Sequence, residues 1–309
     1  MNMLPASIRV IERGWVSSNN IVFLGRDETT IVDTGYGRHA PQTAALVRNA
    51  LGGRPLDRIV NTHAHSDHIG GNAALVREHV GAHVMIPAGE AEVVRDWDEE
   101  ALHLGPMGQQ CERFAFAATY ADSDTLTLGD LNWRALASPG HDNESLMLWC
   151  ATERILISAD ALWESGFGVI FPALPPASDP GPAFAAQRAT LDIIAALDAR
   201  LVIPGHGAPF NDVRAALGRA YSRLDYFEAD PARNARNAAR VTLAFLVMSE
   251  GRIEWATLGA RLARMSLVER INRAFYDLPA DEFAALLAGE LVKGGVARRA
   301  GGYLEVVAR

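Results

Sequence analysis

The stretch NTHAHSDHIGG, residues 61–71, concentrates three of the nine histidines of this chain, with one aspartate, in six consecutive positions. The resulting pattern is H-x-H-x-D-H, made by His63, His65, Asp67 and His68. The pattern follows an apolar run that predicts a strand. In extended backbone, residues two positions apart project from the same side, and the glycine pair that ends the stretch permits a bend. The spacing therefore predicts a metal site carried on a loop.

Three further residues of ligand type stand where later predicted strands end. His141 follows Pro139-Gly140, Asp160 closes the apolar run RILISAD, and His206 lies between two glycines in VIPGHG. Loops at strand ends can gather binding groups at one edge of a sheet. Four candidates from one segment cannot complete two metal shells, so we expect these three side chains to supply the missing ligands.

The first 210 residues alternate short apolar runs with helical patterns. The expected strands are 20–25, 29–35, 56–63, 82–87, 124–128, 132–138, 145–150, 154–160 and the start of 200–207, and the expected helices are 40–53, 71–81, 88–104 and 183–198. Interleaved strands and helices predict an α/β fold, a layered core with helices on its outer faces. The segment 166–182 holds five of the fifteen prolines and should be an irregular loop.

From about residue 210 the pattern becomes helical, and we expect a catalytic domain at 1–229 and a smaller domain at 230–309. The smaller domain shows helical patterns at 235–251, 254–264 and 280–295, followed by a hairpin that turns at Gly301-Gly302. Three helices and a two-stranded wing resemble a winged-helix domain. A DNA-reading module needs a basic third helix, whereas this one has a single lysine against three acidic residues. We expect a packing, lid or homodimer role instead.

Charge and composition narrow the classes of partner. The chain has a net charge of −8, and residues 1–229 carry 17 basic against 28 acidic side chains. An acidic main body repels phosphates, so we expect a small-molecule substrate rather than nucleic acid. No run reaches the length of a membrane span, the N-terminus lacks signal-peptide features, and two cysteines cannot form a disulfide framework. These features favour a cytoplasmic protein without a membrane partner.

The ordered motifs H-x-H-x-D-H, G-H, A-D and G-H resemble the metallo-β-lactamase-fold hydrolase superfamily. VFLGRDETTIVDTGYG, residues 22–37, also resembles the paired strands that open that fold. The resemblance spans about residues 8–215 and implies an αββα sandwich with two divalent metal ions at one sheet edge. Asp33, which lies within residues 22–37, is expected to accept hydrogen bonds from backbone amides beneath the metal loop.

The resemblance also implies a ligand set. His63, His65 and His141 would hold the first metal, Asp67, His68 and His206 the second, and Asp160 would bridge both along with a hydroxide. Imidazoles and carboxylates suit zinc, which is the metal we expect here, and they also accept iron or manganese. Asp67 and Asp160 take a catalytic role as well, because their carboxylates compensate metal charge. A metal lowers the pKa of its bound water to roughly 7, which makes hydroxide available at neutral pH.

Asp160 distinguishes branches of the superfamily. The true β-lactamases with this opening motif typically lack that aspartate, whereas thioesterases, lactonases, phosphodiesterases and nucleases have it. The resemblance therefore implies hydrolysis of an ester, thioester or lactone. Glyoxalase II, a thioesterase with the full ligand set, has a threonine after the third-histidine motif and a basic patch for glutathione. GHDNES, residues 140–145, and a single lysine depart from that pattern and disfavour glutathione thioesters in particular.

Two alternatives to this function stay open. A nuclease that cleaves RNA or another phosphodiester uses the same fold, but the acidic main body disfavours it. A redox protein with two irons usually has an acidic residue in place of one histidine of the opening motif, and this chain does not. Trp163, Phe167 and Phe171 follow Asp160 closely and are expected to line an apolar substrate pocket, with a self-packed loop as the equal alternative.

Overall fold

The computed structural model of the chain describes residues 4–175 and 179–307, which form two compact units. The first unit contains the residues up to Leu102 together with Gln110–Gly168 and Ala183–Leu224. The second contains His103–Gln109, Val169–Pro182 and the chain from Asp225 onward. No helix in the described part of the chain combines the length and apolar composition needed to cross a bilayer.

A six-stranded sheet opens the first unit. Its strands, in spatial order, are β1 (Ile8–Ile11), β2 (Asn20–Leu24), β3 (Thr29–Val32), β4 (Arg58–Val60), β5 (His83–Pro87) and β6 (Ala118–Tyr120). Strands β1 to β3 pair antiparallel, and β3 to β6 pair parallel. The predicted hairpin is confirmed, with Ile21 opposite Val32. The short β1 and β6 were not expected from the sequence.

A five-stranded sheet forms the other half of the first unit. Its strands, in spatial order, are β11 (Leu201–Pro204), β10 (Ile155–Ala159), β9 (Leu146–Cys150), β8 (Leu131–Ala137) and β7 (Thr125–Leu128). Strands β10 and β11 are parallel, and the other neighbours are antiparallel. All five match predicted strands, because each is an apolar or alternating run bounded by turn residues.

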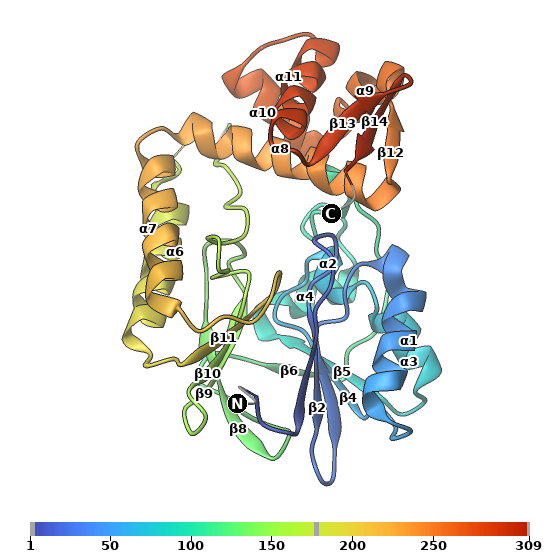
Figure 1. Cartoon of the computed structure of the whole chain (residues 1–309), viewed down its shortest axis with the longest axis vertical. Helices are drawn as coiled ribbons and strands as arrows, with labels where there is room; N and C mark the ends of the chain where they lie inside the picture. Colours follow the sequence, from blue (N-terminus) through green and yellow to red (C-terminus); the bar gives the residue numbers. More distant parts are fainter. Residues whose placement is uncertain (1–3, 176–178, 308–309) are drawn as a thin grey trace. The chain divides into compact units, whose positions relative to one another are not determined.

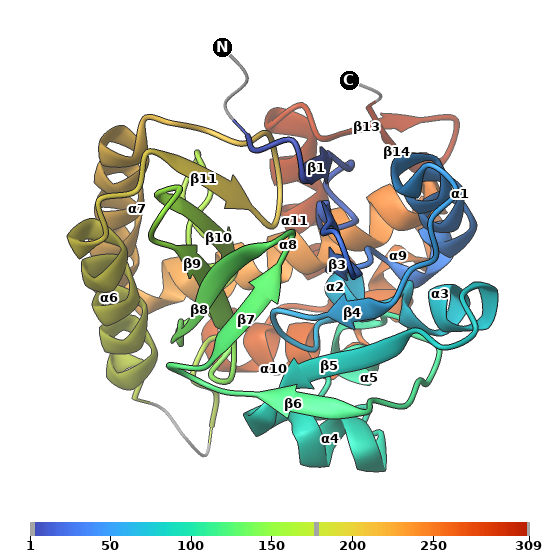
Figure 2. The same cartoon turned by 90° about the horizontal axis from the view of Figure 1, so that it is seen from below.

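Helices cover the outer faces of both sheets (Figure 2). Helices α1 (Ala40–Leu51) and α3 (Asn72–Glu78) lie beside the six-stranded sheet, and α6 (Gly181–Ala196) and α7 (Val213–Glu228) lie beside the five-stranded one. Helix α1 ends at Leu51, and the next residue, Gly52, has a positive φ of 61°, which suits glycine directly after a helix. The expected αββα sandwich is thus confirmed.

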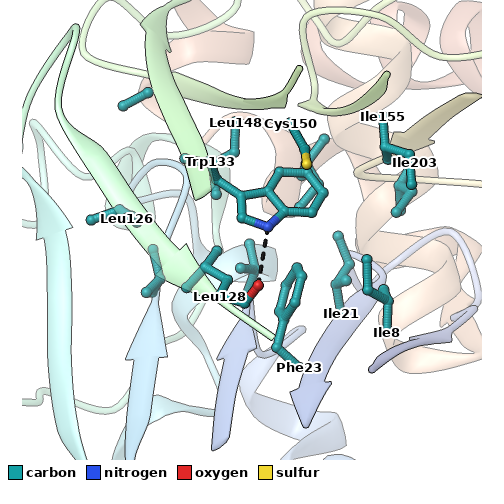
Figure 3. Close-up of a cluster of buried hydrophobic side chains, with 14 of the residues drawn as sticks. Ile8, Ile21, Phe23, Leu126, Leu128, Trp133, Leu148, Cys150, Ile155 and Ile203 are labelled. Carbon is teal, nitrogen blue, oxygen red and sulfur yellow. Dashed lines mark hydrogen bonds between the residues drawn. The ribbon is translucent and has the colours of Figure 1, made fainter. Parts of the chain in front are cut away.

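The core of the first unit lies between the two sheets and centres on Trp133 (Figure 3). This indole is fully buried and meets the ring of Phe23 edge-on, with the ring centroids 5.4 Å apart. Its Nε1 donates a hydrogen bond to the carbonyl oxygen of Leu128 at 3.2 Å. Since Phe23 belongs to β2 and Trp133 to β8, this contact joins the sheets directly.

The predicted helix at 88–104 is wrong in its extent. The structure has a 3₁₀ turn, η2 (Ala88–Glu90), and then α4 (Ala91–Asp96). The next residue, Trp97, has a left-handed conformation with φ of 59°. Asp98 then accepts hydrogen bonds from the backbone amides of Glu100 and Ala101. This local side-chain capping offers the backbone an alternative to the helix.

The second unit combines helices with a small sheet (Figure 1). Its elements are α5 (Leu104–Met107), α8 (Pro231–Glu250), β12 (Arg252–Glu254), α9 (Trp255–Leu262), α10 (Ser266–Phe275), α11 (Ala280–Lys293), β13 (Ala297–Ala300) and β14 (Tyr303–Val306). The hairpin of β13 and β14 was expected, whereas α10 and β12 were not. Helix α10 buries few side chains, and β12 is too short to show a period.

The proline-rich segment 166–182 behaves as an irregular loop over 167–175, as predicted. Residues 176–178 of that segment lie outside the described residues. Helix α6 begins at Gly181, so the last two residues of the predicted loop belong to this helix.

Candidate metal centre

All seven predicted ligands belong to the first unit and follow strand ends. His63 and His65 lie in the loop after β4, Asp67 and His68 lie in the short α2 (Ser66–Ile69), and His141, Asp160 and His206 follow β8, β10 and β11. Strand β4 belongs to the six-stranded sheet and the other three to the five-stranded sheet. All seven side chains are buried except that of Asp67, which is half-buried.

The structure brings these seven residues together in three overlapping groups. The groups are His63, His65 and His141; His63, His68 and Asp160; and Asp67, His68 and His206. In each group, one nitrogen or oxygen atom per residue lies within 4.8 Å of the others. Each group takes members from loops of both sheets.

The first group consists of imidazoles that face one another. The Nδ1 of His65 lies 2.9 Å from the Nε2 of His141. The ring of His63 stands at 86° to that of His65 and at 90° to that of His141. Three ring nitrogens within 4.8 Å of one another are a donor set that suits a divalent cation such as zinc.

The carboxylate of Asp160 faces two groups at once. Its Oδ2 lies 3.4 Å from the Nε2 of His141, and its Oδ1 lies 3.4 Å from the Nε2 of His68 and 3.7 Å from that of His206. We call the side of the cluster with Asp67, His68 and His206 the second side. Asp67 lies on this side only, with its Oδ2 3.2 Å from the Nε2 of His206. Asp160 is therefore the one member of the set whose two oxygens point to different groups.

Asp33 fixes the orientation of His68 from below. Its Oδ2 lies 2.8 Å from the Nδ1 of His68, and its two oxygens accept hydrogen bonds from the amide and hydroxyl of Thr62. The expected bond from Asp33 to a backbone amide beneath the metal loop is confirmed. A carboxylate on one ring nitrogen leaves the other nitrogen, Nε2, to face the centre.

Electrostatics distinguish His63 from His68. Burial, followed by neighbouring imidazoles such as His68, holds the pKa of His63 well below its usual value, so this ring is neutral. Burial also acts to lower the pKa of His68, but the carboxylates of Asp33, Asp160 and Asp67 outweigh it and raise that pKa well above the usual value. Clustered carboxylates therefore attract positive charge to the second side of the centre.

The donor set fits a bound metal ion. The Nε2 of His63 is buried and has no hydrogen-bond partner among the residues that the structure describes, whereas its Nδ1 lies 3.1 Å from the hydroxyl of Thr62. Buried polar atoms normally have a partner, and an ion is one explanation for an orphan. A neutral imidazole nitrogen directed at carboxylates and other imidazoles is a suitable zinc ligand.

The three predicted substrate-binding aromatics have different surroundings. Trp163 lies beside the cluster, with its ring centroid 5.1 Å from that of His206. Phe167 is fully buried, with the guanidinium of Arg223 5.0 Å from its ring centroid. Phe171 belongs to the second unit, where its ring stacks on that of His103 at 4.3 Å. Of the three, the structure brings Trp163 to the ligand candidates.

Sequence reasoning missed three residues next to the cluster. The ring of Trp15 lies 6.3 Å from that of His206, and the Oδ2 of Asp142 lies 3.6 Å from the Nε2 of His65. A Cβ atom on Gly168 would come within 2.7 Å of the Nδ1 of His141, so this position requires glycine. Trp15 lies in an irregular stretch without a motif, whereas Asp142 directly follows a predicted ligand.

Comparison with known families gives one match that covers most of the first unit. The sequence model of the Metallo-beta-lactamase superfamily matches residues 13–206. The match ends at the last of the seven ligand candidates.

Curated relatives are moderately similar and mostly share one name. Hydroxyacylglutathione hydrolases of Rhizobium etli and Rhodopseudomonas palustris are 27% and 28% identical over 133 and 170 residues, covering 43% and 54% of this chain and 44% and 56% of those proteins. The acyl-coenzyme A thioesterase MBLAC2 of Bos taurus is 28% identical over 159 residues, 45% of this chain and 56% of its own. The chain thus spans about half the length of the curated relatives it matches.

Solved structures share the fold over longer stretches. A metallo-beta-lactamase family protein of Thermus thermophilus aligns with a TM-score of 0.58 at 21% identity, covering 97% of this chain and 98% of that one. A beta-lactamase domain protein of Burkholderia ambifaria gives 0.57 at 18% identity, covering 99% and 97%. The class B3 di-zinc metallo-beta-lactamase LRA-12 from an Alaskan soil metagenome gives 0.57 at 20%, covering 71% and 90%.

Proposed function

Since this chain belongs to the metallo-beta-lactamase superfamily, we propose that it is a metal-dependent hydrolase of small-molecule thioesters, with esters and lactones as related substrates. The relatives named hydroxyacylglutathione hydrolase and acyl-coenzyme A thioesterase support the thioester in particular. All three substrate types present a carbonyl carbon to attack by water, so one site can serve them.

The single observation that carries this proposal is the position of Asp160. Its two carboxylate oxygens lie 3.4 Å from His141 on one side and 3.4 Å from His68 on the other. A carboxylate placed between two groups of imidazoles suits a centre of two metals better than a centre of one.

We assign the ligands by these groups. His63, His65 and His141 would hold one metal ion, and Asp67, His68 and His206 the other. Asp160 would hold both, since its two oxygens face His141 and His68. Two divalent ions bound there would supply Lewis-acid polarisation of the carbonyl and a lowered pKa for water. Zinc is the ion that this donor set favours.

The remaining residues of the site orient these groups and shape the space around them. Asp33 accepts a hydrogen bond from the Nδ1 of His68 and so directs Nε2 toward the centre. Trp15 and Trp163 flank His206 with their rings and present apolar surface there. We expect the acyl part of the substrate to contact these rings, because apolar walls favour apolar groups.

A role in reading nucleic acid is disfavoured for the C-terminal region, residues 230–309. Helix α11 exposes Asp281 and Glu282, and its Glu290 pairs with Arg236 of α8. An acidic surface on that helix repels phosphates. We propose that this region serves in packing, as a lid or in a homodimer. Light scattering of the purified protein tests whether it forms a homodimer.

The experiment that tests the function combines metal content with a substrate panel. Elemental analysis should find about two divalent ions per chain. The zinc-loaded protein is then assayed with acyl-coenzyme A thioesters of increasing acyl length, a hydroxyacylglutathione, aryl esters, lactones and single-stranded RNA. We expect thioester turnover, lowered at least ~100-fold by Asp160→Asn.

A matched control is Asp198→Asn, which changes an exposed carboxylate that pairs with Arg154. This variant should keep full activity. Cleavage of RNA without cleavage of any thioester, ester or lactone, abolished by Asp160→Asn, would establish the nuclease alternative instead. A protein that binds no metal would refute the proposal.

A further inference from the structure

We propose that Trp163 is a positioning residue that orients the carboxylate of Asp160, and through it the second of the two metal ions. The inference rests on the two-metal site proposed above. It gives Trp163 a role within the centre, in addition to the apolar surface that its ring presents.

The contact that carries the inference is a hydrogen bond from the indole to the carboxylate. The Nε1 of Trp163 donates to the Oδ1 of Asp160 at 3.2 Å. This is the same oxygen that faces the Nε2 of His68 and the Nε2 of His206. A hydrogen bond to an ionised acceptor is stronger than one between neutral groups and restricts rotation of the carboxylate.

The ring of Trp163 also contacts a second member of the same side. Its centroid lies 5.1 Å from that of His206, with the two planes at 68°. One side chain therefore contacts both Asp160 and His206, while the other carboxylate oxygen, Oδ2, faces His141. The indole acts on the side of the second metal rather than on the side of the first.

The backbone of Trp163 is held in place by a tight turn. Its amide donates to the carbonyl of Gly166 at 2.6 Å, and the amide of Gly166 donates back at 3.2 Å. Two arginines of α7 bind the same loop, since Arg219 donates to the carbonyl of Glu164 and Arg223 to that of Phe167. The indole is thus fixed by the protein and does not depend on a ligand for its orientation.

The backbone around Asp160 is equally constrained. Its carbonyl accepts a hydrogen bond from the amide of Gly168 at 2.8 Å. The hydroxyl of Ser158 donates to the carbonyl of Leu162, and the side-chain amide of Gln187 donates to that of Ala161. Because donor and acceptor both start from a rigid loop, the hydrogen bond between them is preorganised, as effective outer-sphere contacts must be.

The experiment removes the donor and keeps an aromatic ring. In Trp163→Phe, the edge contact with His206 can persist while the N–H group is lost. Zinc binding is measured by competition with a chromophoric chelator, without any assay of turnover. Loss of an outer contact typically weakens metal binding 10- to 100-fold. We expect that weakening at one zinc site and an unchanged affinity at the other.

Trp133→Phe is the matched control, because it also removes an indole donor at 3.2 Å, here to the carbonyl of Leu128 in the core. It should lower the stability to denaturant and leave both zinc affinities unchanged. Trp163→Leu is a second variant, which should weaken the same zinc site at least as much as Trp163→Phe.

The outcomes separate this inference from the proposed function. If the unmodified protein binds two zinc ions and Trp163→Phe binds both with affinities within twofold of the original, the positioning role is wrong. Equal weakening of both sites in that variant would also overturn it. If the unmodified protein binds fewer than two metal ions, the proposed two-metal site itself fails.

Discussion

The Nδ1 atom of His68 lies 2.8 Å from the Oδ2 atom of Asp33, and both side chains are buried beneath the candidate metal centre. The carboxylate can only accept in this hydrogen bond, so the proton is on Nδ1 of the imidazole. In the neutral ring, the form that binds a metal ion, the lone pair of Nε2 is thereby directed at the place where the ion would bind. Asp33 sets the protonation pattern of a ligand without being a ligand.

Asp33→Asn should weaken binding of one zinc ion by about 10- to 100-fold. The amide group of asparagine can donate to Nδ1 of His68, which then carries its proton on Nε2, the wrong nitrogen for a metal. Chelator competition measures the affinity. Asp57→Asn is the control, because Asp57 also accepts from an amide and a hydroxyl, those of Thr29, away from the cluster. Equal affinities in Asp33→Asn and the unmodified protein would contradict the expectation.

Single ligand removals should separate the two proposed metal sites. His65 occurs only in the all-histidine group, and His206 only in the group with Asp67. After dialysis, His65→Ala and His206→Ala should each retain about one zinc ion per chain instead of two, as measured by elemental analysis. His83→Ala, which alters an exposed histidine of β5, should retain both. A full complement of zinc in either ligand variant would argue against the assignment.

Trp15→Ala should change substrate preference more than turnover of the smallest substrate. The ring of Trp15 lies near His206, on an irregular stretch between β1 and β2. If the acyl chain contacts it, kcat/KM for long acyl thioesters should fall about tenfold, roughly the effect of losing contact with one or two methylene groups. The acetyl thioester should be affected little. Trp97→Ala, which removes a tryptophan packed on Phe114, serves as the control and should show no dependence on acyl length.

Trp133→Ala should destabilise the protein by about 3–5 kcal/mol, because it deletes a large, fully buried side chain between the sheets. The measurement is the free energy of unfolding from chemical denaturation, followed by circular dichroism. Val80→Ala, at a side chain that is 96% exposed, should change it by less than ~0.5 kcal/mol. A similar small change in Trp133→Ala would mean that the core is not organised as in Figure 3.

Neither cysteine of the folded protein should react readily with Ellman's reagent. Burial, with a smaller effect of Glu112, raises the pKa of the Cys111 thiol to about 12. The thiolate is the reactive form, so at pH 8 only about one in ten thousand of these thiols is ionised. Cys150 is fully buried. The reaction should accelerate with increasing pH, and the denatured protein should release two equivalents of chromophore. Fast release of one equivalent from the folded protein at pH 7 would contradict this prediction.

Strand ends are the part of this molecule that sequence reasoning predicts best. The ligand candidates follow apolar runs, and His141 and His206 also stand beside glycine, so the strands and the turns after them can be inferred. The breaks in 88–104 are less visible, because the left-handed Trp97 and the capping Asp98 look like ordinary members of an acidic helix. Helix α10 was also not predicted, although half of its ten residues are apolar and Leu267, Val268 and Ile271 are buried.

Proximity along the chain says little about the direction of a side chain. Phe167 follows Asp160 by seven residues, yet its ring lies against Arg223 of α7, a contact that depends on how the helix packs. Trp163 and Trp15 are both beside His206, although one is in a motif-bearing segment and the other far from it. Such placements are set by tertiary packing, which periodicity and motif spacing do not contain.

Each group of ligand candidates draws on loops from both sheets. A bound ion would consequently act as a cross-link between the two halves of the sandwich, closing long chain loops such as the 76-residue separation of His65 and His141. Anything that binds only the folded state stabilises it in proportion to the logarithm of its concentration. The thermal stability of this protein should therefore rise with the concentration of free zinc, and a chelator should weaken the packing of the two sheets against each other.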